Sequence, residues 1–146
     1  MDTSIHENFH ALGLSEALLG DLAKAGYTSP TPIQTQAIPP AMAGRDVIGC
    51  AQTGTGKTAA FGIPAVEKVD VASRAVQVLI LCPTRELAQQ VAAELRSVQP
   101  GLAISLLVGG MPYGPQERAL RLGSPVVVGT PGRVIDHLER KNLDLS

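Results

Sequence analysis

The chain has 146 residues, of which 45% are hydrophobic and 17% are charged. This length fits one domain, and this composition supplies a hydrophobic core and argues against disorder. The net charge of −1 excludes the strongly basic balance that announces a nucleic-acid binder, so any such role has to rest on particular residues. No apolar run reaches the roughly 18 residues of a membrane helix, and the polar N-terminus lacks the apolar core of a signal peptide. We expect a cytoplasmic protein without a membrane segment.

Two cysteines, Cys50 and Cys82, lie in apolar stretches without metal-binding spacing. We expect both to be reduced and buried as small hydrophobic residues. The histidines form no ligand cluster in the sequence, so a His/Cys metal site is not predicted.

The N-terminal third predicts helices. Residues 9–26 carry the leucines of an amphipathic helix or a pair of turns, namely Leu12, Leu14, Leu18, Leu19 and Leu22. Thr31 followed by Pro32 is typical of a helix N-cap and first helical position. We expect the short helix that follows to end at Pro39 and Pro40.

From residue 46 onward, apolar runs alternate with helical patterns. The runs are nearly continuous and bounded by Gly or Pro, which predicts strands buried on both faces: Asp46–Ala51, Val76–Leu81, Ala103–Val108 and Pro125–Val128. Helices are expected over about 56–69, from the N-cap Thr84 to about 99, and over 115–122 and 133–141. Their expected apolar stripes are Leu87, Val91 and Leu95 in the second of these helices, and Val134, Ile135 and Leu138 in the last.

Strand–helix alternation predicts an α/β fold, a parallel sheet with helices on both faces. Ligands of such sheets bind at the carboxyl ends of the strands. The loops of interest are therefore AQTGTGKT, CPTREL, GGMPYG and GTPGR, each directly after an apolar run.

The loop AQTGTGKT matches the phosphate-binding pattern G-x-x-x-x-G-K-[ST] at Gly54, Gly56, Lys57 and Thr58, with Ala51 in the place of the first glycine. Glycines let backbone N–H groups and a helix N-terminus face phosphates. Lysine at this position reaches the β- and γ-phosphates, and threonine offers its hydroxyl to Mg²⁺. The alternative is a Gly/Thr-rich turn with a solvated lysine. The loop alone indicates a nucleoside triphosphate, without indicating which base.

Five segments in order resemble the motifs of the DEAD-box RNA helicases: GYTSPTPIQ, AQTGTGKT, PTRELA, the pair Gly109-Gly110, and TPGR. The resemblance runs from residue 9 to the end of the chain. It implies a RecA-like phosphate-loop fold and an ATP-dependent RNA helicase. That family opens its phosphate loop with Ala as often as with Gly, so Ala51 fits it.

The resemblance implies that ATP and Mg²⁺ are the cofactors. Gln34 would read adenine through its amide, Tyr27 would lie against the adenine ring, and Phe9 would support that pocket. Lys57 and Thr58 would be catalytic, with Thr58 also the metal ligand. The remaining phosphate-cradle residues would be Ala51, Gln52, Thr53, Gly54, Thr55 and Gly56. The alternatives are that Phe9 and Tyr27 anchor the N-terminal segment and that Gln34 caps a helix.

RNA is the partner that the resemblance implies, held by its backbone without sequence readout. The residues that match the family's contact loops are Pro83, Thr84, Arg85, Gly109, Gly110, Thr130, Gly132 and Arg133. The alternatives are a local ion pair for Arg85 and a plain turn for the two glycines. Glu86 is interpreted as a structural partner of these loops.

The carboxylates that hold Mg²⁺ and orient the attacking water are missing, because no apolar run leads into Asp-Glu. We therefore expect residues 1–146 to be the N-terminal, incomplete portion of a RecA-like ATP-binding domain, with an adenine-recognition region at 9–34 and the phosphate and RNA-contact loops at 45–146. A second RecA-like domain would be its partner. The chain by itself is expected to bind nucleotide weakly and not to hydrolyse it. The alternatives are an unrelated phosphate-loop ATPase or small kinase, and a non-catalytic nucleotide- or RNA-binding module.

Overall fold

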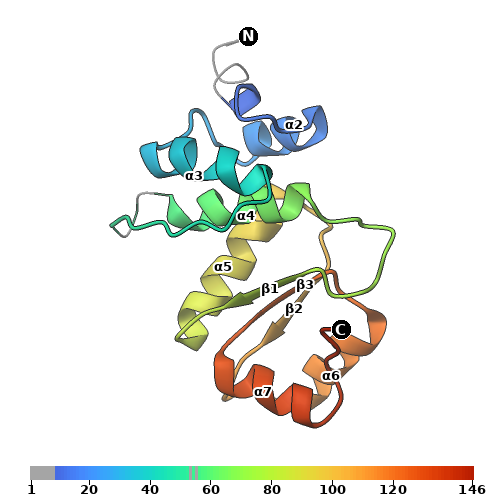
Figure 1. Ribbon diagram of the computed structural model, residues 1–146. Helices are drawn as coiled ribbons and strands as arrows, with labels where there is room; N and C mark the ends of the chain where they lie inside the picture. Colours follow the sequence, from blue (N-terminus) through green and yellow to red (C-terminus); the bar gives the residue numbers. More distant parts are fainter. Residues whose placement is uncertain (1–8, 53, 55) are drawn as a thin grey trace. The chain divides into compact units, whose positions relative to one another are not determined.

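The computed structural model describes residues 9–52, 54 and 56–146 (Figure 1). The chain divides into two compact units. Unit 1 comprises Met1–Lys68 and Glu94–Pro100, and unit 2 comprises Val69–Ala93 and Gly101–Ser146.

Unit 1 contains the helices α2 (Glu16–Lys24), α3 (Pro32–Met42) and α4 (Lys57–Glu67), with the end of α5 (Arg85–Val98). Ser15 begins α2, because its Oγ accepts a hydrogen bond from the Leu18 N–H at 3.3 Å. The leucines expected on the buried face of this region are buried, which confirms that pattern: Leu12, Leu14, Leu18, Leu19 and Leu22.

Helix α3 continues through Pro39 and Pro40 to Met42, so the expected end at these prolines is wrong. A proline removes one N–H donor and fixes φ near its helical value, so it weakens a helix without forbidding it. The last turn still closes, because the Ala43 N–H donates to the Pro39 carbonyl at 3.0 Å. Burial of Ala37 and Ile38 stabilises the helix that these prolines weaken.

The apolar run Asp46–Ala51 forms no strand, which corrects the expectation of a buried strand before the phosphate loop. Ile48 is 97% exposed and Cys50 is also exposed, so the expected burial of Cys50 is wrong too. A strand exists only where neighbouring strands pair with its backbone, and hydrophobicity does not supply that pairing. Cys82 is buried as expected, and burial raises the pKa of its thiol.

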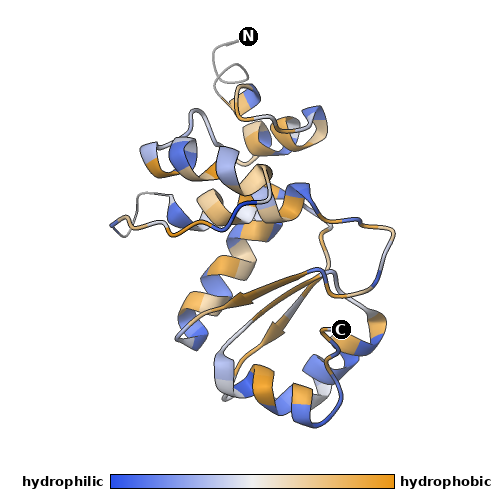
Figure 2. Cartoon of the chain, viewed as in Figure 1, coloured by the Kyte–Doolittle hydropathy of each residue, from blue (hydrophilic) through white to orange (hydrophobic). Residues whose placement is uncertain are grey.

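Unit 2 holds a parallel sheet of three strands, β1 (Val78–Leu81), β2 (Ile104–Leu107) and β3 (Val126–Gly129), in the order β1-β3-β2. Val126 pairs with Val78 on one side and with Ile104 on the other. Every residue of β3 is buried, as predicted for a central strand. The strands are strongly hydrophobic in Figure 2, yet Leu79 and Leu81 of the edge strand β1 are exposed, so burial on both faces is wrong for β1.

The helices of unit 2 are the start of α5, α6 (Tyr113–Leu122) and α7 (Pro131–Glu139). Thr84 caps α5, as predicted, because its Oγ1 accepts from the Leu87 N–H at 3.2 Å. Gly123, with a φ of +88°, ends α6 at the predicted residue.

The buried faces of α5 and α7 differ from the expected stripes. Leu87, Ile135 and Leu138 are exposed, whereas Val91, Leu95 and Val134 are buried. His137 lies on the buried face of α7, because polar neighbours satisfy both of its ring nitrogens. The core beneath α7 consists of Leu107, Val127, Val134 and Leu143.

Among the helices that the structure describes, each is too short or too polar to span a bilayer.

Candidate functional site

The phosphate loop leads into α4 through two glycines in left-handed conformation. Gly54 has a φ of +84° and Gly56 a φ of +86°, values that favour glycine. Gly56 is the N-cap of α4 and brings no side chain to the first turn, so the N–H groups of that turn are available to an anion. Lys57, the first residue of α4, is exposed, and Thr58 is half-buried.

Thr53 and Thr55, which the sequence also assigns to this loop, lie outside the described residues. Ala51 is half-buried and Gln52 is exposed. Ala51 does not follow a strand, contrary to expectation, because the preceding run forms none.

Gln34 joins α3 to the phosphate loop. Its side chain is 2% exposed, its Oε1 accepts from the Thr31 N–H at 3.0 Å, and its Nε2 donates to the Gly56 carbonyl at 3.2 Å. A Cβ at Gly56 would lie 2.4 Å from Gln34 Nε2 and 3.0 Å from Thr31 Oγ1. The glycine therefore permits the loop to approach α3 this closely.

Thr31 is a residue that sequence reasoning read only as a helix cap. Its Oγ1 is buried and makes no hydrogen bond within the part of the chain that the structure describes. The Gln34 half of a capping box forms, and the threonine hydroxyl lies near Gly56, where an added Cβ would be 3.0 Å from Oγ1. The signal that could have found it is the spacing T-x-x-Q at the start of the helix that precedes the phosphate loop in the chain.

Phe9 and Tyr27 pack against each other edge to face, with ring centres 6.5 Å apart and planes at 81°. Phe9 is fully buried, and the Tyr27 hydroxyl donates to Glu94 Oε1 at 2.8 Å. Burial, followed by that hydrogen bond, raises the pKa of Tyr27 well above its usual value. These contacts match the anchoring alternative for both rings.

The second group of predicted residues follows the strands of unit 2. Because the sheet is parallel, the loops 83–85, 109–112 and 130–133 leave the same end of it. None of the predicted RNA-contact residues there is buried: Pro83, Thr84, Arg85, Gly109, Gly110, Thr130, Gly132 and Arg133.

Arg85 lies against Gly110, because a Cβ at Gly110 would sit 2.5 Å from Arg85 Nη1. Arg85 Nη2 also pairs with Glu86 Oε1 at 3.5 Å, as the alternative for this residue proposed. Both side chains are exposed, and an exposed ion pair contributes little stability. The guanidinium thus remains accessible to an anion.

Arg133 is held by the loop that follows β2. Its Nη1 donates to the Met111 carbonyl at 2.9 Å and to Gln116 Oε1 at 3.3 Å. Its guanidinium carbon lies 3.9 Å from the centre of the Tyr113 ring. Sequence reasoning missed both Tyr113 and Gln116, since nothing in a single sequence links α6 to the start of α7.

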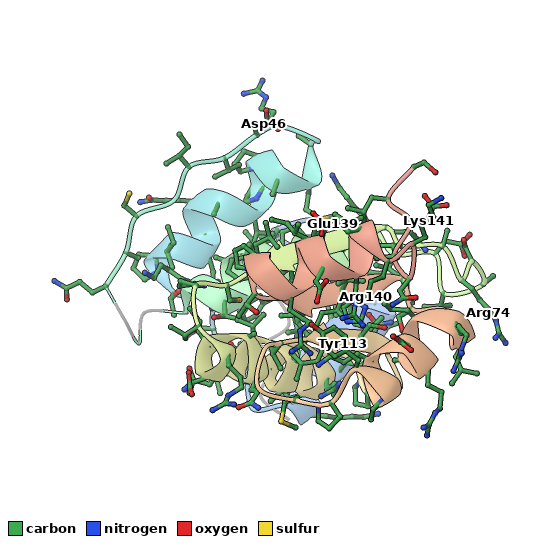
Figure 3. The ribbon with its side chains drawn as sticks, turned by 90° about the horizontal axis from the view of Figure 1, so that it is seen from below. Asp46, Arg74, Tyr113, Glu139, Arg140 and Lys141 are labelled. Carbon is green, nitrogen blue, oxygen red and sulfur yellow. The ribbon has the colours of Figure 1, made fainter. Side chains whose placement is uncertain are left out.

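A second guanidinium, that of Arg140, also packs against the Tyr113 ring, with its carbon 3.9 Å from the ring centre. Figure 3 shows the two residues side by side. The Tyr113 hydroxyl hydrogen-bonds to Asp136, and Arg140 Nε pairs with Asp136 at 3.4 Å. The hydrogen bond from Tyr113 lowers the pKa of Asp136 and raises that of Tyr113. Asp136 is therefore committed to a structural ion pair.

Comparison with known proteins decides the family. The sequence-family model of the DEAD/DEAH box helicases matches residues 31–146 of the chain. The chain belongs to the DEAD/DEAH box helicase family. It is 51% identical over 141 residues to the ATP-dependent RNA helicase DeaD of Klebsiella pneumoniae, covering 94% of this chain and 22% of that protein. The chain thus spans about a fifth of this relative.

Solved structures of helicase relatives share the fold. A DEAD box protein from the hyperthermophile Methanococcus jannaschii matches with a TM-score of 0.88 and 41% identity, over 94% of this chain and 38% of that one. A hypothetical ATP-dependent RNA helicase from Sulfolobus tokodaii matches with a TM-score of 0.81 and 34% identity, over 91% and 39%. The parallel sheet with helices is accordingly the RecA-like fold of DEAD-box proteins, as predicted.

Proposed function

We propose that this chain carries the adenine pocket, the phosphate loop and the first RNA-contact loops of an ATP-dependent RNA helicase. The observation that carries the proposal is the hydrogen bond from Gln34 Nε2 to the Gly56 carbonyl. It connects the residue proposed to read adenine with the loop proposed to hold the phosphates.

The residues of the phosphate loop fit a nucleotide. Left-handed glycines precede a helix that starts without a side-chain cap, and the buried Thr31 hydroxyl has no partner within the described residues. Lys57 would hold the distal phosphates and Thr58 would hold Mg²⁺. When bound, Mg²⁺ neutralises charge on the phosphates.

The Gln34 amide is already partly used in the structure, which limits how it can bind adenine. Both ends of the Gln34 amide already make hydrogen bonds, to the Thr31 N–H and the Gly56 carbonyl. A carbonyl oxygen has a second lone pair and an NH₂ group has a second hydrogen, so the amide can add one bond at each end. We propose that these remaining positions serve the adenine edge, while the existing bonds keep the amide in one orientation.

The RNA-contact loops support binding to a nucleic-acid backbone. Accessible glycines, the Thr84 and Thr130 hydroxyls and two arginines lie after strands of one parallel sheet. Such groups bind phosphates and 2′-hydroxyls without reading bases. The proposed partner is therefore RNA, bound through its backbone and without sequence specificity.

We propose that ATP hydrolysis needs a longer helicase, which also contains a second RecA-like domain. The sequence contains no apolar run that leads into Asp-Glu, so the carboxylates for Mg²⁺ and water are lacking here. We propose that the chain alone binds adenine nucleotide weakly and does not hydrolyse it. That absence favours a non-catalytic nucleotide- and RNA-binding module as the description of this chain by itself.

Base selectivity tests the proposal. Calorimetric titration should show binding of ATP, ADP and AMP but not GTP, and Gln34→Ala should remove that preference. Gln36→Ala is the matched control, because Gln36 is exposed on the same helix α3. Equal binding of GTP by the unmodified chain would contradict adenine recognition, and RNA-stimulated phosphate release would contradict the proposed inactivity.

A further inference from the structure

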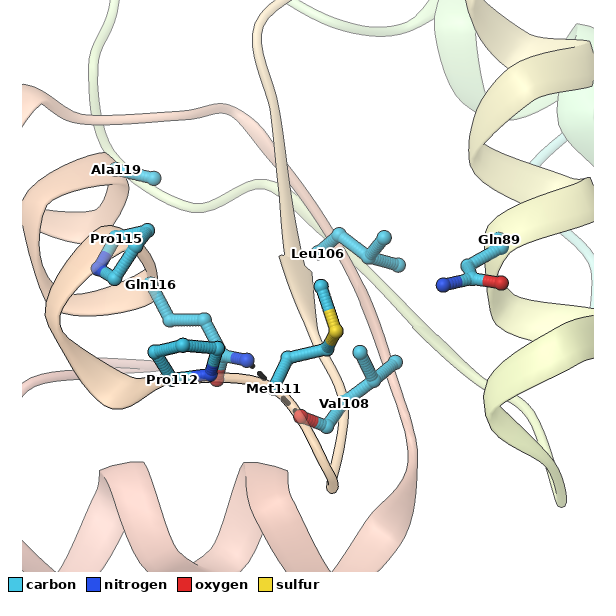
Figure 4. A pocket seen from close by; sticks show the side chains of 8 residues that line it. All are labelled: Gln89, Leu106, Val108, Met111, Pro112, Pro115, Gln116 and Ala119. Atoms are coloured by element: carbon cyan, nitrogen blue, oxygen red, sulfur yellow. Dashed lines mark hydrogen bonds between the residues drawn. The ribbon is translucent and has the colours of Figure 1, made fainter.

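Gln116 is a buried polar side chain at the meeting point of two loops. It lies on α6, is 6% exposed, and its Nε2 donates to the Val108 carbonyl at 2.9 Å (Figure 4). Its Oε1 accepts from Arg133 Nη1 at 3.3 Å and lies 2.8 Å from His137 Nε2. The same amide therefore binds the end of β2, the start of α7 and the interior face of α7.

His137 completes the network on its buried side. Gln116 Nε2 is the donor to the Val108 carbonyl, so the Oε1 is an acceptor and His137 Nε2 must carry the proton that meets it. His137 Nδ1 then accepts from Asn142 Nδ2 at 3.2 Å. Burial, followed by the charge of Arg133, lowers the pKa of His137, which agrees with a neutral ring.

The position of Arg133 follows from these contacts. Its Nη1 divides between the Met111 carbonyl and Gln116 Oε1, and Tyr113 supports the plane of the guanidinium. The loop 109–112 is anchored by Gln116 where it leaves Val108, and by Arg133 at Met111. Gln116 thus bonds both to Val108, directly before Gly109 and Gly110, and to Arg133.

We propose that Gln116 is a positioning residue that holds the loop 109–112 and Arg133 in one fixed arrangement, so that the two loops bind RNA as a single unit. This inference rests on the proposed function of these loops in RNA binding. Gln116 acts through Arg133 and the loop backbone and does not itself touch RNA.

Gln116→Met tests the geometry without RNA. Methionine keeps the length and apolar stem of the side chain but removes the donor and the acceptor, which leaves the Val108 carbonyl and the His137 N–H unpaired. We expect NMR spectra of the variant to show shifted and faster-exchanging amides at Gly109, Gly110 and Met111, and an altered Arg133 Nε–H signal. Gln90→Met, at an exposed position on α5, is the matched control. Unchanged signals in a folded Gln116→Met variant would overturn the inference.

A double-mutant cycle tests the consequence for RNA. Gln116→Met should weaken binding of the chain to an oligouridine about two- to tenfold, the range for a lost internal hydrogen bond. In an Arg133→Ala background the same change should have a smaller effect, because the part that acts through Arg133 is already lost while the bond to the Val108 carbonyl remains. If the losses of RNA-binding free energy in the two single variants add fully in the double variant, the inference is overturned, since Gln116 then acts independently of Arg133.

Gln116→Glu keeps the test decisive if the methionine variant does not fold. The carboxylate retains an acceptor for Arg133 and His137 but faces the Val108 carbonyl without a donor. We expect its effect on RNA affinity also to depend on Arg133, and additivity would again overturn the inference. If the unmodified chain binds no RNA, the proposed function fails, and the NMR comparison still decides whether Gln116 positions the loops.

Discussion

The proposed phosphate loop and the proposed RNA-contact loops are held in place by different means. The apolar run before the phosphate loop is exposed and forms no strand, and the loop is tied to α3 through Gln34. The RNA-contact loops follow three paired strands, and Arg85, Gln116 and Arg133 join one loop to the next. A parallel sheet therefore positions the loops at its end, whereas the phosphate loop depends on one buried amide.

This difference predicts that changes near each group of loops affect one ligand and leave the other unchanged.

Lys57→Ala should lower ATP affinity by roughly 10- to 100-fold, as expected for a lost hydrogen bond to a charged group. AMP affinity should barely change, because the lysine is assigned to distal phosphates, and oligouridine affinity should not change. Lys68→Ala is the control: Lys68 follows the same helix and donates to the Ala41 carbonyl at 2.8 Å. Isothermal titration with ATP and AMP measures the effect. Equal losses for both nucleotides would remove Lys57 from the phosphate site.

Gly56→Ala should destabilise the chain and weaken nucleotide binding. The methyl group would collide with Gln34 Nε2 at 2.4 Å, in addition to a left-handed backbone cost of about 1–2 kcal/mol. Gly54→Ala is the matched control, since Gly54 has a similar φ of +84° but its added Cβ would meet none of the described residues within 4 Å. Urea unfolding should show the larger loss for Gly56→Ala. Equal losses would mean that the contact with Gln34 does not restrain the loop.

Arg85→Ala should weaken oligouridine binding about tenfold and reduce the salt dependence by the equivalent of one phosphate contact. Nucleotide affinity should stay the same. Arg74→Ala is the control, because Arg74 donates to the Leu122 carbonyl at 2.9 Å at the opposite end of α6 from the RNA-contact loops. Fluorescence anisotropy over a series of salt concentrations measures both quantities. An unchanged salt slope would assign Arg85 to its ion pair with Glu86.

Acidification should cause the smallest effect, a modest loss of stability through His137. Its pKa is lowered in the folded chain, first by burial and then by Arg133, so the folded state resists protonation more than the unfolded state does. Above the ordinary pKa of about 6.5 both states are neutral and the histidine contributes nothing to pH dependence. Below it, stability should fall until the pH reaches the folded pKa.

The measurement is the urea midpoint at about pH 7.5 and about pH 5.5, compared between the unmodified chain and His137→Gln. The charged groups around His137 are Arg133, Asp136, Glu117 and Arg140, and they are the same in both proteins. The variant should therefore lose less stability on acidification. Equal losses would show that the network around Gln116 tolerates an imidazolium.

Much of the fold could be predicted from local pattern. Thr84 and Gly123 bound their helices as expected, because a hydroxyl cap and a glycine with a positive φ act within a few residues of themselves. The strands around Val78, Ile104 and Val126 form where the apolar runs lie. The errors occur where a distant partner decides the outcome. The run at Ile48 forms no strand because strand formation needs pairing, and α3 continues through Pro39 because its buried face stabilises it.

The candidate site shows the same division. The family resemblance identified in the sequence is confirmed, and the loops after β1, β2 and β3 leave one end of a sheet as expected. The roles of the individual site residues stay predictions. The contacts among those residues could not be predicted, because Gln34 with Gly56, Arg85 with Gly110, and Gln116 with Arg133 are pairs far apart in the chain.

By itself, the sequence determined the family, the strand–helix alternation and the residue types proposed to contact phosphates and RNA, because these depend on short motifs in a fixed order. The tertiary structure decided which strand is central, that Gln34 is bonded to the phosphate loop, and that Gln116 and Tyr113 hold Arg133. Burial and long-range hydrogen bonds determine these features, and both require the chain to be folded before the partners meet.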